Sequence, residues 1–441
     1  MAKGFAAIPR ATRYVLANAT LPAILVDAPP GKPDAEALVA ADIAVRDGVV
    51  ERIDPPGRRT TAPKLNLDRG MVWPCFIDMH THLDKGHISP RAANPDGTFA
   101  SALDAVDVDR RANWNAGDVT ARMEFSLRSA HAHGTALIRT HIDSAAPQHK
   151  ISWPVFAEVR DRWAGRIDLQ GVSLFAIDQF LDEAFADDVV ETVARHGGLL
   201  GAATFMIPEL DKALDLMMLR AANRGLDLDF HVDETGDPAA TSLRAIADAA
   251  LRTSFPGAIT AGHCCSLATQ PEAEAEATME RVAEAGMAVV SLPMCNMYLQ
   301  DRAAEPGSRR TPRWRGVTLV HELADHGVPV AVASDNTRDP FYAYGDLDMV
   351  EVFREAVRIL HLDHPIGSWP AAVTRTPAAI VGRPERGVIA VGQPADLVAF
   401  RARDFTELLA RPQTDRTVLR SGNAIDTTPP DYRELDELLQ R

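Results

Sequence analysis

The stretch Phe76-Ile77-Asp78-Met79-His80-Thr81-His82-Leu83-Asp84 decides how this chain is expected to fold, because an apolar run ends there in two histidines. Residues i and i+2 of a β-strand point to the same face, so His80 and His82 should project side by side. Two imidazoles about 7 Å apart at a strand end are well placed to share a divalent metal ion. A lone His-x-His pair fits a solvated or buried pair equally well, so the prediction depends on further ligands.

Three later polar residues also end apolar runs. They are His231 in Phe230-His231-Val232-Asp233-Glu234, His263 in Ala261-Gly262-His263, and Asp335 in Ala333-Ser334-Asp335-Asn336. Together with the first pair they predict one metal site that is assembled from distant parts of the chain.

From about residue 71 the chain alternates apolar strand-like runs with amphipathic helical stretches. Eight strands are expected, at residues 72–80, 135–142, 169–175, 199–205, 228–232, 258–263, 288–293 and 328–334. Helical patterns lie between them at 119–133, 184–196, 210–224, 242–253, 272–285 and 318–325. This alternation predicts an α/β fold, a (β/α)8 TIM-like barrel, and the continuous hydrophobicity of the strands favours burial on both faces. An open, doubly wound parallel sheet is the alternative.

The barrel prediction has a functional consequence, because active sites of this fold lie at the C-terminal ends of its strands. The five polar residues fall at the ends of predicted strands one, five, six and eight. Histidines that merely fill a core would have no reason to be distributed in this way.

The two ends of the chain have a different pattern. Short β-like pieces at 23–26, 43–45 and 49–53 are separated by turns rich in Pro and Gly, and similar pieces return at 387–389, 396–400 and 416–420. We therefore expect residues 1–70 and 385–441 to form a small β-sandwich domain beside a barrel of residues 71–384. The segment Arg302–Arg315, rich in charge, Pro and Gly, is expected to be an exposed loop near the barrel mouth.

Composition excludes several classes of partner. The 441 residues carry 61 Asp+Glu against 46 Lys+Arg, a net charge of −15, which argues against nucleic acid or an anionic membrane surface as a main partner. No apolar run approaches the roughly 20 residues of a membrane span, and no signal peptide is evident. The four cysteines form no Cys-x-x-Cys pair and are expected to be buried thiols, so the cytoplasm is the predicted location.

Several motifs, taken in order, resemble those of the amidohydrolase superfamily, and specifically its cytosine deaminase-like branch, over roughly residues 40–425. The stretches that carry the resemblance are His80-Thr81-His82-Leu83-Asp84, Arg139-Thr140-His141-Ile142-Asp143, His231-Val232-Asp233-Glu234, Asn296-Met297-Tyr298-Leu299-Gln300 and Ser334-Asp335-Asn336-Thr337-Arg338-Asp339-Pro340-Phe341-Tyr342. The resemblance implies a mononuclear centre, with one Zn²⁺ or Fe²⁺ per chain bound by His80, His82, His231 and Asp335. It also implies that Glu234 shuttles protons, that His263 stands beside the metal-bound water, and that the protein could form a homo-oligomer.

The residue types suit hydrolysis of a heterocycle. A metal ion lowers the pKa of bound water from 15.7 towards about 7, which makes hydroxide available at neutral pH. Asp335 could accept a proton from that water, and His263 could stabilise the developing oxyanion. Glu234 could protonate a ring nitrogen, which makes the neighbouring carbon electrophilic. His141, between Arg139 and Asp143, is interpreted as structural.

The substrate signals depart from cytosine deaminase. The glutamine expected after strand three is replaced in Ser173-Leu174-Phe175-Ala176-Ile177-Asp178, and Gln179 comes several residues later. Asn336 stands where a second aspartate is expected and Phe341 where a tryptophan is expected. Loss of a polar clamp weakens the assignment to cytosine, because unpaired buried polar groups discriminate strongly. The predicted substrate-binding residues are Leu83, Phe175, Asn336 and Phe341.

The predicted function is therefore hydrolytic deamination of an amino-substituted N-heterocycle, with pyrimidine, pterin, purine, triazine and creatinine-type rings left open. The alternative on the same metal centre is hydrolysis of an N-alkylamino-heterocycle or a cyclic amide. A catalytically silent barrel that acts as a binding protein is a third hypothesis, but it predicts lost ligands, and all the expected ligands are present.

Overall fold

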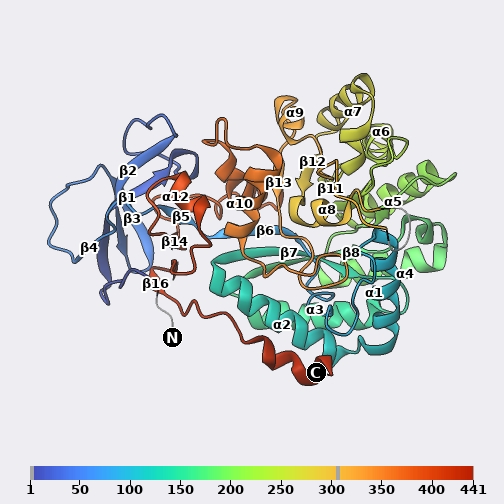
Figure 1. The fold of residues 1–441 in the computed structure, drawn as a ribbon, viewed down its shortest axis with the longest axis horizontal. Helices are drawn as coiled ribbons and strands as arrows, with labels where there is room; N and C mark the ends of the chain where they lie inside the picture. Colours follow the sequence, from blue (N-terminus) through green and yellow to red (C-terminus); the bar gives the residue numbers. More distant parts are fainter. Residues whose placement is uncertain (1–3, 304–307, 441) are drawn as a thin grey trace. The chain divides into compact units, whose positions relative to one another are not determined.

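The computed structural model describes residues 4–303 and 308–440. The chain divides into two compact units that are each built from distant segments (Figure 1). The first unit holds Met1–Asp78, Arg128–Leu137 and Leu347–Pro430, and the second holds Met79–Leu127, Ile138–Asp346 and Asp431–Arg441.

The eight strands of the predicted barrel region form two sheets. The first has the order β6-β7-β8, and its strands are β6 (Phe76–Thr81), β7 (Thr135–Asp143) and β8 (Asp168–Leu174). The second is parallel, and its strands in order are β9 (Ala203–Thr204), β10 (Leu228–Val232), β11 (Ile259–His263), β12 (Ala288–Ser291) and β13 (Val330–Val332). Isolated parallel bridges join Ala176 to Ala203 and Thr81 to Asp335, just beyond the outer strands of the two sheets.

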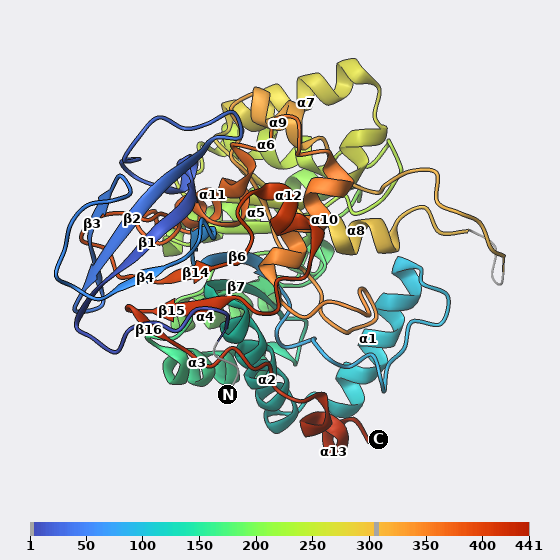
Figure 2. The same cartoon turned by 60° about the vertical axis from the view of Figure 1, so that its left-hand side comes forward.

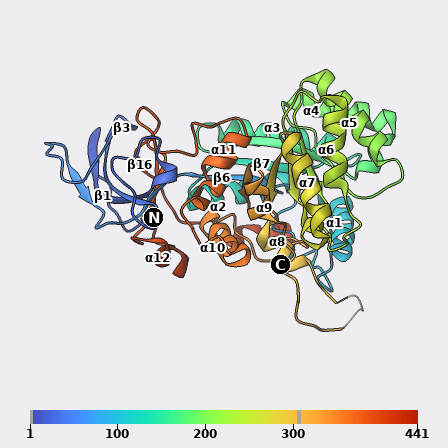
Figure 3. The same cartoon turned by 90° about the horizontal axis from the view of Figure 1, so that it is seen from above.

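Nine helices of the described residues lie between or just before these strands. They are α1 (Phe99–Asn113), α2 (Ala116–His133), α3 (His149–Trp163), α4 (Glu183–His196), α5 (Leu210–Arg224), α6 (Ser242–Thr253), α7 (Glu272–Glu284), α8 (Pro293–Leu299) and α9 (Val320–Asp325). Helices α4 to α7 follow one another along the strands (Figure 3). The bounds of α5 and α6 are those predicted. Helix α5 ends where Gly225 adopts a left-handed conformation (φ 64°), which a residue without Cβ tolerates.

Four predicted strands differ from the observed ones by more than one residue at an end, and one of them, expected at 328–334, is shortened to β13 (Val330–Val332). The expected strand at 72–80 is two strands, because β5 (Val72–Pro74) pairs with a different sheet from β6. The expected strand at 199–205 is reduced to β9 and to bridges at Leu199 and Leu200, because the Ser173 hydroxyl accepts from the Gly201 amide at 2.9 Å and donates to the Gly201 carbonyl oxygen at 3.0 Å in place of ladder hydrogen bonds. A Cβ at Gly201 would lie 2.2 Å from the Asp229 carbonyl oxygen. The strand at 288–293 ends at Ser291, since Pro293 begins α8.

The first unit contains two further sheets. One has the order β3-β2-β1-β4, and its strands in chain order are β1 (Arg13–Pro22), β2 (Leu38–Arg46), β3 (Val49–Asp54) and β4 (Lys64–Asn66). The other has the order β16-β15-β14-β5, with β14 (Leu397–Ala399), β15 (Thr417–Arg420) and β16 (Asn423–Ala424). Figure 2 brings these strands forward. One apolar core includes side chains of both sheets, among them Leu16, Ile43, Leu397 and Leu419.

The remaining helices are short apart from one. They are α10 (Met349–Leu360), α11 (Arg375–Ile380), α12 (Phe405–Ala410) and α13 (Asp436–Leu439). The strand predicted at 23–26 is wrong: Ala23–Leu25 is a 3-10 helix, which follows directly on the long strand β1.

Two other predictions concern the surface and the cysteines. Of the segment Arg302–Arg315, the described residues 308–313 are exposed, while 304–307 lie outside the described residues. All four cysteines are buried and free. Among the described residues, every helix is too short or too polar to cross a lipid bilayer.

Candidate metal centre

Four predicted ligands converge at the carboxyl ends of the strands in the second unit. One ligand atom from each of His80, His82, His231 and Asp335 lies within 4.8 Å of all the others, and all four residues are buried or nearly so. His80 lies in β6, His82 directly after it, His231 in β10, and Asp335 just after β13. The structure therefore brings together residues that are far apart in the sequence.

The geometry of the imidazoles fits a bound cation. His231 Nε2 lies 3.2 Å from His80 Nε2 and 3.1 Å from His82 Nε2. Tetrahedral ligands at 2.0–2.1 Å from a metal ion stand about 3.3 Å apart. Burial lowers the pKa of all three imidazoles well below 6.5, so each is neutral and offers a lone pair. Three lone pairs that face one another repel unless a cation lies between them.

Asp335 is held at this centre by backbone geometry. Its amide donates to the His80 carbonyl oxygen at 2.9 Å, which joins the end of β13 to β6. It adopts φ +65°, an uncommon conformation for a residue with a side chain. Its Oδ1 lies 3.1 Å from His82 Nε2 and 3.6 Å from His80 Nε2. The carboxylate thus completes a donor set of three imidazoles and one carboxylate, which suits zinc and iron.

Glu234 follows β10 at the edge of the same centre. Asp233, one residue earlier, accepts hydrogen bonds from the amides of Ser242 (3.2 Å) and Leu243 (3.0 Å) and so ties this turn to the start of α6. Burial, and then the Asp335 carboxylate, raises the pKa of Glu234 well above 4.5. A carboxyl group with a raised pKa can hold a proton near neutral pH and transfer it.

His263 ends β11 with its ring close to two of the ligands. Its ring centroid lies 5.3 Å from that of His80 and 5.0 Å from that of His231. Burial, and then the Lys85 ammonium, lowers the pKa of His263 to about 3, so the ring is neutral. A neutral imidazole carries one N–H donor, which suits an oxygen that gains negative charge during a reaction.

A cavity of about 720 Å³ opens onto these side chains. Its lining includes His82, His231, Glu234 and His263, together with three of the four residues predicted to bind substrate, Phe175, Asn336 and Phe341. The fourth, Leu83, is 2% exposed and does not belong to the lining, so its contact with substrate stays a prediction. Aromatic and aliphatic side chains form much of the wall, among them Phe99, Leu103, Phe205 and Leu299.

Lys85 brings a buried positive charge to the cavity wall. Its Nζ lies 3.2 Å from Asp143 Oδ1 and 5.0 Å from the centroid of the Phe341 ring. Burial alone would lower its pKa, but Asp143, Asp339 and Asp84 outweigh burial and raise it. From the sequence, Lys85 is a candidate for lining the mouth of the site, and the structure places it in the cavity wall.

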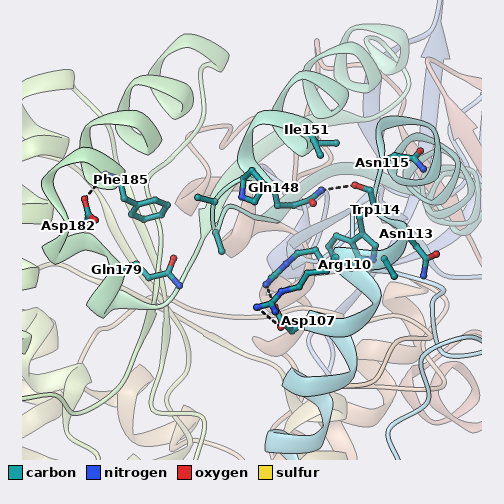
Figure 4. Close-up of a pocket in the computed structure, with 15 residues that line it drawn as sticks. Asp107, Arg110, Asn113, Trp114, Asn115, Gln148, Ile151, Gln179, Asp182 and Phe185 are labelled. Atoms are coloured by element: carbon teal, nitrogen blue, oxygen red, sulfur yellow. Dashed lines mark hydrogen bonds and ion pairs between the residues drawn. The ribbon is translucent and has the colours of Figure 1, made fainter.

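A second cavity of about 870 Å³ adjoins the first (Figure 4). Asp107, Arg110, Ala145 and Gln179 line both cavities. Figure 4 shows Arg110 paired with Asp107 on α1, and Gln179 on the far side of the space. Gln179 was judged too late in the sequence for a substrate contact, yet it lies at the junction of the two cavities.

Two residues of the predicted segment after strand seven contact Glu234. Asn296 Nδ2 lies 3.1 Å from Glu234 Oε1, and Gln300 Nε2 lies 3.0 Å from the Glu234 carbonyl oxygen. His141, interpreted as structural, packs against the centre with its ring centroid 4.0 Å from that of His80. Its Nε2 lies 3.8 Å from Asp229 Oδ1, and this role also stays a prediction.

Comparison with known proteins adds independent information. A model described as the Amidohydrolase family matches residues 175–425. A pterin deaminase of Rhizobium rhizogenes (strain K84) is 60% identical over 443 residues, covering 100% of each chain. An N-isopropylammelide isopropyl amidohydrolase of Pseudomonas sp. (strain ADP) is 23% identical over 371 residues, covering 82% of this chain and 87% of the other.

Solved structures extend the comparison to the fold. A crystal structure of 5-methylcytosine deaminase from Klebsiella pneumoniae, liganded with 5-fluorocytosine, matches with a TM-score of 0.77 at 22% identity. The match covers 95% of this chain and 98% of the other. This likeness shows a mixed α/β fold of the TIM-barrel type.

Proposed function

Because the chain belongs to the amidohydrolase family, we propose that it is a metal-dependent hydrolytic deaminase of an amino-substituted heterocycle and that its substrate is a pterin. It is a hydrolase that acts on a carbon–nitrogen bond outside peptides. The observation that carries the choice of substrate is the 60% identity to a pterin deaminase over the full length of both chains. A pterin is a planar two-ring pteridine with an amino group on carbon 2, and its hydrolysis replaces that amine by an oxo group and releases ammonia.

The cavity supports a planar bicyclic substrate. Its volume of about 720 Å³ is within the range of small-molecule sites, and its walls are largely apolar and aromatic. The ring of Phe175 stacks on that of Phe180 with centroids 5.7 Å apart and planes 11° apart, which gives this wall a flat face. Asn336 Nδ2 donates to Asp339 Oδ2 at 2.7 Å, so the Asn336 amide is fixed in orientation at the cavity edge.

We assign His80, His82, His231 and Asp335 as the ligands of one Zn²⁺ or Fe²⁺ ion per chain. The bound ion supplies hydroxide at neutral pH, because coordination lowers the pKa of water from 15.7 to about 7. Neutral imidazoles and one carboxylate bind either metal, so metal analysis of protein grown with each metal is the test of identity.

The chain's own side chains then carry the proton transfers. Glu234, with its raised pKa, donates a proton to the ring nitrogen beside the amine-bearing carbon, which becomes electrophilic. His263 donates a hydrogen bond to the oxygen that gains charge as water adds. Asp335 takes one proton of the attacking water. Glu234, ionised by its first transfer, takes the proton of the newly added hydroxyl group and passes it to the amine, which leaves as ammonia, and the proton held by Asp335 then restores Glu234. Water and the aminoheterocycle are thereby converted into the oxo-heterocycle and ammonia.

We also propose the finer organisation of the fold. The strands β6 to β13 close into one eight-stranded barrel formed by residues 71–384, which the two isolated bridges support. Residues 1–70 and 385–441 form a small β-sandwich domain, which the shared apolar core of the two antiparallel sheets supports. Four free, buried cysteines support a cytoplasmic location, and a homo-oligomer is proposed by family resemblance alone.

The decisive experiment is ammonia release by the metal-loaded protein with pterin, cytosine, guanine and N-isopropylammelide. Rapid release from pterin, with the 2-oxo product confirmed by mass, is the expected result. Release of isopropylamine from N-isopropylammelide, without ammonia from pterin, would overturn the proposal in favour of the N-alkylamino-heterocycle hydrolase.

A further inference from the structure

Asn296 is a buried amide on α8 that the mechanism above leaves without a role. Its side chain is 0% exposed, and its Nδ2 lies near two different proton-carrying groups at once. One is Glu234 Oε1 at 3.1 Å, and the other is His263 Nδ1 at 2.9 Å. The two groups are 3.5 Å apart from each other, so one amide nitrogen bridges both.

The chemistry of the amide decides the direction of these hydrogen bonds. Asn296 Nδ2 donates to Glu234 Oε1, an oxygen that accepts both when the carboxyl group is ionised and when its proton lies on Oε2, so the Asn296 nitrogen rather than its oxygen faces Glu234. The same nitrogen then faces His263 Nδ1, and its second hydrogen makes that ring atom an acceptor. In a neutral imidazole the proton therefore lies on the other nitrogen, Nε2.

His263 Nε2 is the ring nitrogen that this arrangement leaves available to donate a hydrogen bond. It is buried and has no hydrogen-bond partner among the described residues, and His263 lines the cavity. A donor in this position can serve the oxygen that gains negative charge, whereas the opposite tautomer would present a lone pair to it.

We propose that Asn296 is a positioning residue with two effects. It fixes His263 in the Nε2-protonated tautomer, and it holds Glu234 Oε1 in place through a second hydrogen bond from the same nitrogen. This inference rests on the proposed function and deepens it. A primary amide is required because it provides two donor hydrogens from a single atom. Aspartate at this position has none when ionised, and serine has one.

The surroundings of α8 hold Asn296 in place. Gln300 directly follows α8 and donates to the Glu234 carbonyl oxygen at 3.0 Å, so one side chain of α8 and one just beyond its end hold the same residue. Gly316 lets the opposing chain approach closely, since a Cβ there would lie 2.7 Å from the Asn296 carbonyl oxygen and 2.5 Å from Gln300 Cβ. The helix also begins with Pro293 in its first turn, a favourable position for proline.

Steady-state kinetics with pterin give the first test, using Asn296→Ala and Asn296→Asp in metal-loaded protein. Loss of a preorganised donor lowers kcat by about 10²–10³-fold, so we expect kcat to fall at least about 100-fold while KM changes less than about threefold. Metal content should stay at the wild-type level. Met297→Ala, an exposed neighbour on the same helix, should keep wild-type kcat. In a His263→Gln background, Asn296→Ala should cost clearly less than it does in wild type, because the part of its effect that passes through His263 is already lost and only the contact with Glu234 remains. Equal losses in both backgrounds would overturn the inference.

The second test reads the tautomer directly and needs no substrate. In zinc-loaded protein labelled with ¹⁵N-histidine, the signals of His263 are those lost in His263→Gln. In wild type, Nε2 of His263 should be protonated and Nδ1 unprotonated. The Asn296→Ala variant should show a mixture of the two tautomers, and the Asn296→Asp variant should show the tautomer protonated at Nδ1. A wild-type ring protonated at Nδ1 would overturn the role of Asn296. Failure of wild type to deaminate pterin would instead overturn the proposed function, so the two failures are distinguishable.

Discussion

At the scale of single residues, Glu234 and Asp335 form the critical electrostatic pair of the centre. Burial and the neighbouring carboxylate both favour the protonated form of Glu234. A neighbouring carboxylate disfavours ionisation of a buried carboxyl group, so Glu234 retains its proton more readily than an isolated glutamate. In the proposed mechanism, Glu234 transfers this proton to the ring nitrogen of the substrate.

Replacing Glu234 by Gln tests this proton transfer. The amide has nearly the same shape but cannot transfer a proton, so we expect kcat for deamination to fall by at least about 100-fold. Metal content measured by mass spectrometry should be unchanged, because Glu234 is not among the proposed ligands. Full activity in the Gln variant would contradict the mechanism.

Gly262 leaves room for His80, one of the proposed metal ligands. A side-chain carbon there would lie 2.8 Å from His80 Cε1 and 3.0 Å from His80 Nδ1, so the imidazole would have to move. We expect Gly262→Ala to weaken metal affinity by about 10–100-fold, the range seen when a ligand loses its supporting contacts. Competition with a chelator of known affinity measures this. Gly117→Ala, whose nearest neighbour would be Asn115 Oδ1 at 3.3 Å, should leave the affinity unchanged.

Some single residues of the candidate site could be predicted from the sequence, and others could not. The residues predicted as ligands could be recognised because each ends an apolar run, and the structure brings them together. The contacts of Asn296 with Glu234 and His263, and of Lys85 with Asp143, could not be predicted, because nothing in the segments of Asn296 and Lys85 indicates which residues would lie beside them. Such pairs depend on how separate strands are placed in three dimensions.

At the scale of secondary-structure elements, one carboxylate at the start of α10 both caps that helix and forms an ion pair with an arginine. Asp348 caps α10 by accepting a hydrogen bond from the Val350 amide at 3.0 Å, and it also pairs with Arg416 through two contacts of 2.6 Å. Burial would raise the pKa of Asp348, but Arg416 and then His133 outweigh it and lower the pKa to about 2. A carboxyl group whose folded pKa is depressed stabilises the fold above its ordinary pKa, and that contribution is lost as pH falls through the folded value.

Asp348→Asn should therefore reduce stability in a pH-dependent way. We expect a loss of about 2 kcal/mol in the free energy of unfolding at pH 7, and a loss smaller by about 1 kcal/mol at pH 3. Urea unfolding at the two pH values measures both numbers. Glu407→Gln is the matched control, because Glu407 pairs with Arg403 at the exposed surface, where such pairs contribute little. A loss for Asp348→Asn that does not change with pH would contradict the assignment.

Elements differed in how well the sequence predicted them. The bounds of α5 and α6 followed from an apolar face of helical period and from residues that end helices. The strand expected at 199–205 is interrupted because the Ser173 hydroxyl, which belongs to the adjacent strand β8, takes up the hydrogen bonds of the Gly201 amide and carbonyl groups. Helices α1 and α3 were not predicted, since their apolar positions are interrupted by charges and, in α3, by Pro154.

At the scale of the whole molecule, the proposed centre joins strands from the beginning and the end of the second unit. A metal ion that binds this folded arrangement more tightly than the unfolded chain must stabilise the fold by mass action. We expect removal of metal by a chelator to lower the unfolding temperature by several degrees, and added Zn²⁺ or Fe²⁺ to restore it. Calorimetry measures the shift, and His231→Ala should show no response to metal. An unfolding temperature that is independent of metal in wild type would contradict the ligand assignment.

The separation of His80 and Asp335 along the sequence determines when the proposed metal site can be completed during protein synthesis. The first three proposed ligands are all synthesised by residue 231, but the fourth follows about 100 residues later. At about 5–20 residues per second, translation of the roughly 250 residues from His80 to Asp335 takes roughly 13–50 s. During the last part of that interval the nascent chain carries three histidines without their carboxylate partner. Delivery of the correct ion is therefore a matter of timing as well as affinity: a metal captured early would meet an incomplete set of ligands on the ribosome.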